Sequence, residues 1–152
     1  MRPTSASEAF VTEVRVQKLS PDAKIPAYAK IGDAGADLYS NETVSFSPGE
    51  HRLVSTSIAM AVPKGHVGLI KDRSSLAAKH ALHCLGGVID ENYRHEWKII
   101  MINLGKEAVT LSKHERVAQV LFVPVSVGNF SETAQLDATN RPDGGFGSSG
   151  KN

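Results

Sequence analysis

The chain has 152 residues, enough for one domain with a buried core, and its apolar share of 41% and charged share of 22% are ordinary for a globular protein. A formal net charge of +1 provides no overall field for nucleic acid or an anionic membrane, so we expect neither as a partner. The sequence has no apolar run long enough to span a bilayer, no secretory signal and a single cysteine, which exclude an intramolecular disulfide and favour a reducing location, cytoplasmic or nuclear.

Short β-strands are predicted over most of the chain. Alternating or continuous apolar patterns typical of strands fall at 12–17, 54–62, 97–102 and 117–125. The last two are almost wholly apolar, as strands covered on both faces would be. Proline and glycine predict a type II turn at 47–50 and a type I turn at 62–65.

Strands at this spacing predict an all-β barrel or sandwich in one domain at 1–139. One stretch breaks the pattern: 74–80 is rich in helix formers and begins with Ser74 and Ser75, two possible N-caps. The backbone N–H groups at this helix start, together with Arg73, could bind an anion. Simple capping beside a solvated arginine is the alternative.

Two further segments place carboxylates beside small residues. In 33–38, Asp33 and Asp37 flank a stretch that excludes bulk, although a tight loop with Asx-type turns has the same pattern. In 86–94, paired glycines permit a close backbone approach, and Asp90 follows an apolar pair where it could orient a water as general base. An acidic hairpin turn is the alternative there.

The last two segments are 115–119, at the mouth of an apolar strand, and 140–150. The first is a further candidate for the site, and a surface ion pair is the alternative. The second is too rich in glycine for a helix or strand, and it predicts a mobile arm at 140–152. Arg141 could fork onto a phosphate and Phe146 could stack on a base, whereas an unstructured tail is the alternative.

Patterns for other chemistries are missing from the sequence. His80, His83 and Cys84 lie close together, but no second ligand cluster completes a zinc site, and neither a nucleophile elbow nor a P-loop occurs. Scattered carboxylates, an arginine–serine anion site and a glycine-rich arm indicate water attack on a metal-bound polyphosphate.

Five short segments in this order, at 34–39, 72–77, 87–94, 115–119 and 141–150, resemble the motifs of the homotrimeric dUTP pyrophosphatases (dUTPases) over nearly the whole chain. The resemblance implies a jelly-roll β-barrel with one short helix, assembled as a homotrimer with active sites between subunits. It also implies Mg²⁺-assisted hydrolysis of dUTP to dUMP and pyrophosphate, which supplies dUMP for dTMP synthesis and keeps uracil out of DNA.

The resemblance further implies a role for each matching residue. Asp90 would orient the water that attacks the α-phosphorus, and Tyr93 would lie beneath the deoxyribose. Asp37 would hold Mg²⁺ through water, with Gln119 beside it. The remaining positions expected to bind substrate are Arg73, Ser74, Ser75, Cys84, Gly87, Val88, Ile89, Lys98, Arg141, Phe146, Gly147 and Ser148.

The sequence departs from the family pattern at several positions. Asp72 replaces a common proline, Ser75 a glycine, Cys84 an asparagine and His95 a glycine, and Pro142-Asp143 replaces a glycine-containing pair. A carboxylate beside a phosphate site is unfavourable unless it points away. The altered second motif favours one alternative, a catalytically weak nucleotide-binding or signalling protein. The nearest enzyme alternative is a dCTP deaminase, or a bifunctional deaminase, of the same fold.

Overall fold

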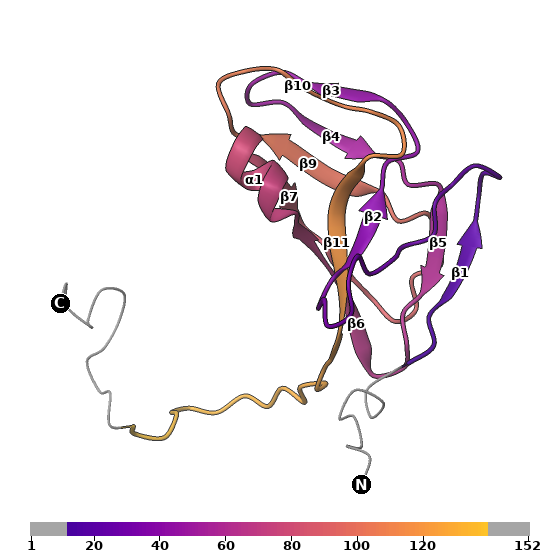
Figure 1. Ribbon diagram of the computed structural model, residues 1–152. Helices are drawn as coiled ribbons and strands as arrows, with labels where there is room; N and C mark the ends of the chain where they lie inside the picture. The colour runs from indigo at the N-terminus through magenta and orange to yellow at the C-terminus, as the bar shows by residue number, and fades with distance from the viewer. Residues whose placement is uncertain (1–11, 140–152) are drawn as a thin grey trace, which may run out of the picture.

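The structure, a computed structural model, describes residues 12–139, so the predicted arm lies outside the described part. This part contains eleven strands and one helix (Figure 1): β1 Arg15–Lys18, β2 Ala36–Tyr39, β3 Val44–Phe46, β4 His51–Val54, β5 Ile58–Ala61, β6 His66–Asp72, α1 Ser74–His80, β7 Leu82–Leu85, β8 Val88–Ile89, β9 Ile99–Asn103, β10 Val109–Leu111 and β11 Arg116–Pro124. The prediction of an all-β, jelly-roll-like barrel with one short helix is confirmed.

All strand pairs are antiparallel and form four small sheets. The largest has the order β2-β11-β6-β8, with the long strand β11 through the middle of the molecule. A second sheet has the order β4-β9-β7, and the pairs β1-β5 and β3-β10 complete the barrel. Since β7 and β8 belong to different sheets, the glycines between them carry the chain from one sheet to the other.

One hydrophobic core joins the sheets. Its largest fully buried side chains include Trp97, Phe46 and Leu38. The Trp97 indole N–H donates to the Met60 carbonyl at 3.3 Å, and its ring lies so close to Gly68 that a Cβ there would sit 2.6 Å from a ring carbon. The indole is therefore locked in place, and it supports one wall of the site described below.

Several sequence-based boundaries need correction. The first strand begins at Arg15 rather than at 12. The run at 54–62 is not one strand, because Ser57 adopts a left-handed φ of 51° between β4 and β5. The two long apolar strands are only partly covered, as Ile100 is 36% exposed and much of β11 is half-buried.

The turn at 47–50 is confirmed, with Gly49 at φ 78° and the Glu50 N–H donating to the Ser47 carbonyl at 3.0 Å. The second turn lies at 63–66, one residue later than predicted, because Gly65 takes the left-handed third position at φ 72°.

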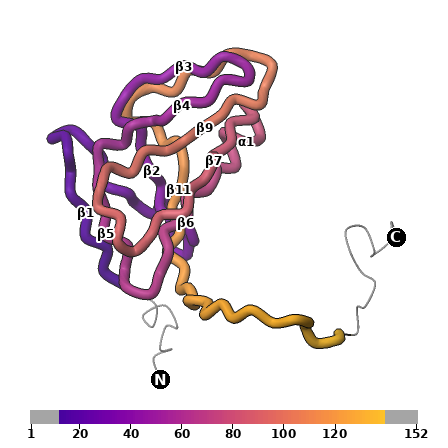
Figure 2. Tube along the Cα trace, turned by 180° about the vertical axis from the view of Figure 1, so that it is seen from behind, coloured from indigo at the N-terminus to yellow at the C-terminus, as the bar shows by residue number. Residues whose placement is uncertain are grey.

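After β11, residues 125–139 lead away from the barrel in both views (Figures 1 and 2). This segment leaves Val127 95% and Phe130 97% exposed, with Leu136 also exposed. Within 12–139, no helix has the length and apolar character needed to cross a membrane.

Candidate functional site

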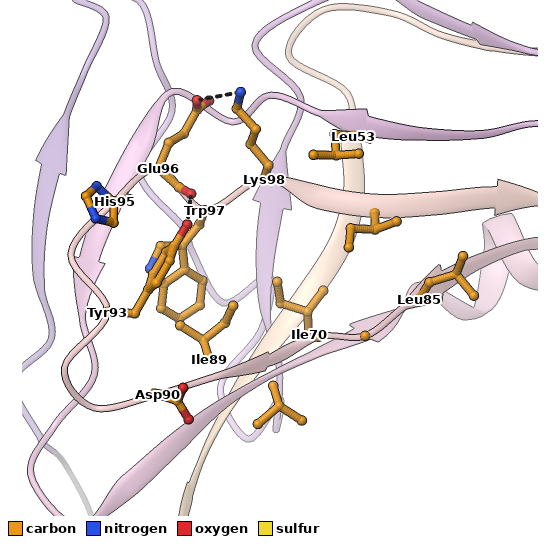
Figure 3. Close-up of a pocket in the computed structure, with 14 residues that line it drawn as sticks. Leu53, Ile70, Leu85, Ile89, Asp90, Tyr93, His95, Glu96, Trp97 and Lys98 are labelled. Atoms are coloured by element: carbon orange, nitrogen blue, oxygen red, sulfur yellow. Dashed lines mark hydrogen bonds and ion pairs between the residues drawn. The ribbon is translucent and has the colours of Figure 1, made fainter.

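An apolar cleft of about 730 Å³ opens between β8 and the segment that leads into β9 (Figure 3). Its lining is Leu53, Ile70, Leu85, Gly86, Gly87, Val88, Ile89, Asp90, Tyr93, His95, Glu96, Trp97, Lys98 and Ile100. Most of these groups are aliphatic or aromatic, with polar groups at the edge, which suits a flat apolar ring that carries a few polar atoms.

The paired glycines position the wall formed by β8. Gly86 and Gly87 have φ of 64° and 87°, which residues with side chains rarely adopt. A Cβ on Gly87 would lie 2.8 Å from the Ile70 carbonyl oxygen, and the Gly87 carbonyl accepts the Ile70 N–H at 2.8 Å. Only glycine permits this approach, so the backbone that leads into β8 lies in direct contact with β6.

β8 is an edge strand. It pairs with β6 through Val88 and Ile89 and with no other strand of the described residues. The backbone N–H and C=O groups on its other side therefore remain outside any sheet ladder in 12–139, and they can bond the edge of a ligand.

Asp90 follows β8 directly and is exposed at the rim of the cleft. A tight turn holds it, in which the Tyr93 N–H donates to the Asp90 carbonyl at 3.1 Å. The Glu91 carboxylate accepts the Gly65 N–H at 2.8 Å and ties this turn to the β5–β6 connection. The Asp90 carboxylate has no hydrogen-bond or ionic partner within 12–139, so its oxygens are free to accept a proton from water.

Tyr93 packs half-buried against the core beside this carboxylate. Its hydroxyl donates to the Glu96 carbonyl at 2.9 Å, and its ring meets His95 edge to face, with centroids 5.6 Å apart. Lys98 lies on the opposite rim, its Nζ 3.7 Å from a Glu96 carboxylate oxygen. The ring is therefore fixed at both its hydroxyl and its edge.

A second pocket, of about 470 Å³, is polar. It is lined by Ala29, Lys30, Asp33, Ala34, Gly35, Asp37, Arg73, Ser74, Ser75, Arg116 and Gln119. The buried Asp37 carboxylate lies between Arg73 Nε at 3.1 Å and Arg116 Nη1 at 3.3 Å. Three cationic side chains thus face two carboxylates, a balance that favours an anionic ligand.

The start of α1 borders this pocket. Arg73 is the N-cap, with its carbonyl accepting the N–H groups of Leu76 and Ala77. The prediction that Ser74 or Ser75 caps the helix is wrong, because the helix has no side-chain cap bond and both serines lie within its first turn. Their side chains line the pocket instead.

Asp72 points away from the polar pocket. Its carboxylate accepts from His83 Nδ1 at 2.7 Å and from the Cys84 N–H at 2.6 Å, both on β7. Burial raises the pKa of Asp72, but these hydrogen bonds outweigh burial and leave the pKa below its usual value. The Asp72 carbonyl accepts the Gln119 side-chain amide at 2.7 Å, which orients Gln119 at the pocket wall.

Cys84 belongs to the core and lies outside the lining of both pockets. Burial, together with the neighbouring Asp72 carboxylate, raises the pKa of its thiol to about 12. Cys84 therefore packs in the hydrophobic core.

The expected site residues therefore fall into two groups on one chain. The apolar cleft collects Gly87, Val88, Ile89, Asp90, Tyr93 and Lys98, and the polar pocket collects Asp37, Arg73, Ser74, Ser75 and Gln119. The expected residues Arg141, Phe146, Gly147 and Ser148 lie outside the described residues. Sequence reasoning missed Glu96, which no local pattern marks. It placed Arg116 in the motif-like segment 115–119 but did not name it as a site residue.

In 12–139, no group of three or more histidine, cysteine or acidic side chains could hold a metal ion by itself. Asp37 and Gln119 lie in one pocket, and two of the four acceptor positions of the Asp37 carboxylate are used by arginines. These residues fit an ion that keeps its waters and takes its remaining ligands from a phosphate, as Mg²⁺ does.

Comparison with known proteins gives one consistent result. The dUTPase family model matches residues 21–150. The chain is 44% identical over 139 residues to a deoxyuridine 5'-triphosphate nucleotidohydrolase of Clostridioides difficile, covering 90% of this chain and 97% of that protein.

Two solved structures are also similar. The dUTPase of Staphylococcus bacteriophage 80alpha with the dUTP analogue dUPNHPP has a TM-score of 0.86 at 27% identity, covering 93% of this chain and 100% of the other. A variant of the dUTPase from phage phi11 of S. aureus, described with a structural Mg(II) ion, has a TM-score of 0.76 at 25% identity, covering 82% of this chain and 98% of the other.

Proposed function

The chain belongs to the dUTPase family of hydrolases, and we propose that it converts dUTP to dUMP and pyrophosphate by water attack on the α-phosphorus. The observation that carries the proposal is an edge strand that borders an apolar cleft and ends on a carboxylate with no partner in 12–139. The family match and the analogue-bound relative support the choice of dUTP as substrate.

The cleft would hold the nucleoside. The backbone groups at Gly87, Val88 and Ile89 that are not bonded to β6 would bond the polar edge of uracil, and the apolar wall would cover its faces. Tyr93 would lie beneath the deoxyribose, where its ring leaves no room for a 2′-hydroxyl. Lys98 on the rim would contact the substrate. Cys84, buried behind the wall, would act on the substrate only through packing.

Asp90 would be the general base. Its exposed carboxylate can accept the proton of a water as that water attacks phosphorus. The tight turn and the Glu91–Gly65 hydrogen bond keep this carboxylate in one place at the cleft rim. Proton removal at this position makes the water a better nucleophile without a covalent intermediate.

The polar pocket would bind the triphosphate. Arg73, Ser74 and Ser75 would bond phosphate oxygens, with the arginine giving charge-assisted hydrogen bonds. Asp37 and Gln119 would hold waters of a Mg²⁺ ion bound to the phosphates. When bound, the ion would neutralise charge that develops on the phosphate oxygens. The metal dependence of the dUTPase family supports a metal ion at this site.

We further propose a homotrimer whose active sites lie between subunits. Among residues 12–139, Lys98 is the one lysine or arginine that lines the nucleoside cleft, which is too little charge for a triphosphate. Lys30, Arg73 and Arg116 line the separate polar pocket. One subunit would supply the cleft and a neighbour the polar pocket. The exposed apolar residues Val127, Phe130 and Leu136 support burial of the segment after β11 in an assembly.

The C-terminal arm at 140–152 would close the site as a unit separate from the barrel at 1–139. Arg141 would reach the γ-phosphate, Phe146 would stack on uracil, and Gly147 and Ser148 would approach the phosphates. In a cell, the reaction would supply dUMP for dTMP synthesis and keep uracil out of DNA.

The test is pyrophosphate release from dUTP compared with dCTP, dTTP and UTP, with and without Mg²⁺ after treatment with a chelator. We expect release from dUTP alone, and only with the metal. Ammonia from dCTP would indicate a deaminase instead, and tight dUTP binding without turnover would indicate a nucleotide-binding or signalling protein. Sedimentation at several protein concentrations tests the trimer.

A further inference from the structure

Glu96 lies in the short segment between the tight turn at Asp90 and β9, and it lines the nucleoside cleft. One carboxylate oxygen, Oε1, accepts the Ser55 hydroxyl at 2.5 Å and the Ser57 N–H at 2.9 Å. These two serines belong to the break between β4 and β5, at sequence separations of 41 and 39 residues from Glu96. The side chain therefore joins the cleft wall to another part of the barrel.

The break that Glu96 joins is strained. Ser57 has a left-handed φ of 51°, a conformation that is unfavourable for a residue with a side chain. The Glu96 carboxylate accepts the Ser57 N–H in this conformation and so stabilises it. Burial raises the pKa of Glu96, but the hydrogen bonds from Ser55 and Ser57 and the charge of Lys98 outweigh burial, so the pKa lies below its usual value and the group stays anionic.

The backbone of the same residue holds Tyr93. The Tyr93 hydroxyl donates to the Glu96 carbonyl at 2.9 Å, as Figure 3 shows beside the Glu96–Lys98 ion pair. Glu96 thus has its side chain bonded to the β4–β5 break and its carbonyl bonded to the ring that faces the cleft. A shift of its backbone would move the far end of that ring.

We propose that Glu96 is a positioning residue for substrate specificity: its anchored side chain fixes the Tyr93 ring at the depth that excludes a ribose 2′-hydroxyl. This inference rests on the proposed dUTP hydrolysis, which makes Tyr93 the sugar filter. The Tyr93 ring can exclude a single hydroxyl oxygen only if the ring moves by less than the size of that atom. The contacts that hold the ring in place therefore matter as much as the ring itself.

The matched control is Glu42. Its carboxylate accepts the Ser55 N–H at 2.7 Å, so it bonds the same break from another side, but it does not line the cleft. Glu96→Ala and Glu42→Ala each remove one carboxylate from this break. They differ in that, of the two, only Glu96 lines the cleft, accepts the Tyr93 hydroxyl at its carbonyl and pairs with Lys98.

The experiment measures kcat/KM for dUTP and for UTP in the full-length protein. We expect Glu96→Ala to lower the dUTP-to-UTP ratio by about tenfold or more, the size of one lost hydrogen bond to a charged group. Glu96→Gln, whose amide oxygen can still accept from both serines, should retain most of the ratio. Glu42→Ala should leave it unchanged, even if stability falls. An unchanged ratio in Glu96→Ala, or an equal loss in Glu42→Ala, would overturn the proposal.

Two measurements keep the proposal testable if Glu96→Ala does not fold or if the wild type does not hydrolyse dUTP. Tyr93→Phe removes only the hydroxyl bond and should lower the ratio part of the way, so a full wild-type ratio would contradict the role of this bond. NMR of labelled tyrosine, of which the chain has three, reports the Tyr93 ring without turnover. A Tyr93 ring that is equally rigid in wild type and Glu96→Ala would overturn the positioning role of Glu96, whether or not dUTP is hydrolysed. A wild type that hydrolyses nothing would overturn the proposed function alone.

Discussion

The two pockets are lined by different kinds of groups. The cleft at β8 is formed by core side chains such as Trp97 and Ile70 and by backbone that glycine brings close. The polar pocket is formed by ionised side chains that neutralise one another, with Asp37 held between Arg73 and Arg116. The first has a shape that packing fixes in advance, whereas the second has charges that can exchange partners when an anion binds.

This difference suits the two pockets to different parts of the substrate. A base and a sugar are recognised by shape and by a few backbone bonds, which need rigid walls. A triphosphate is recognised by charge, and charged side chains keep their partners until the ligand replaces them. Substitutions in the two pockets should therefore have different effects on kcat, KM and stability.

The largest effect should come from Asp90→Asn. The amide cannot take the proton of the attacking water, so we expect kcat to fall by about 10²- to 10⁴-fold, while binding of dUPNHPP changes little because the cleft keeps its shape. Pyrophosphate release and calorimetry measure the two quantities. Glu107→Gln, an exposed carboxylate outside both pockets, is the control. Unchanged turnover would refute the role of Asp90.

In the polar pocket, Arg73→Ala should act mainly through KM. Loss of a charge-assisted bond to phosphate should raise KM about ten- to a hundredfold, with a smaller change in kcat. The variant also leaves Asp37 with Arg116 as its remaining arginine partner, so excess negative charge near the phosphates adds to the effect. Steady-state kinetics with dUTP separates the two constants, and a KM equal to that of the wild type would contradict phosphate binding by this pocket.

Much of this division could be predicted from the sequence, and some could not. Glycine at 86 and 87 before an apolar pair and an aspartate indicates a close backbone approach, and the structure has it. The left-handed Ser57 could not be predicted, because its partner Glu96 lies 39 residues away. The direction of the Asp72 side chain could not be predicted either, because it depends on contacts with β7 that form only in the folded barrel.

Glycine substitutions should separate the pockets by stability. Gly87→Ala combines a left-handed φ with a Cβ 2.8 Å from backbone, and we expect a loss of about 2–3 kcal/mol in the free energy of unfolding. Gly35→Ala would place a Cβ 2.3 Å from the Gln119 side-chain oxygen, which can move, so we expect about 1 kcal/mol. Urea unfolding at one protein concentration measures both. Equal losses would show that the cleft is no more rigid than the polar pocket.

The smallest effect should be the pH dependence of the Asp72 contact with β7. Because the pKa of Asp72 in the folded chain lies below the ordinary value of 3.8, its ionised form stabilises the fold above about pH 3.8. This contribution is lost as pH falls through the lower, folded pKa. Asp72→Asn should therefore be less stable than the wild type at neutral pH, by less than about 1 kcal/mol because the pair with His83 is partly exposed.

The difference between wild type and Asp72→Asn should shrink as the pH falls from 3.8 through the lower, folded pKa of Asp72, since the wild-type carboxylate becomes protonated over this range. Chemical unfolding at a series of pH values measures it, and Asp137→Asn, an exposed aspartate outside both pockets, should show no such convergence. A stability difference that stays constant with pH would contradict this prediction. It would mean that the charge of Asp72 does not contribute to its contact with β7.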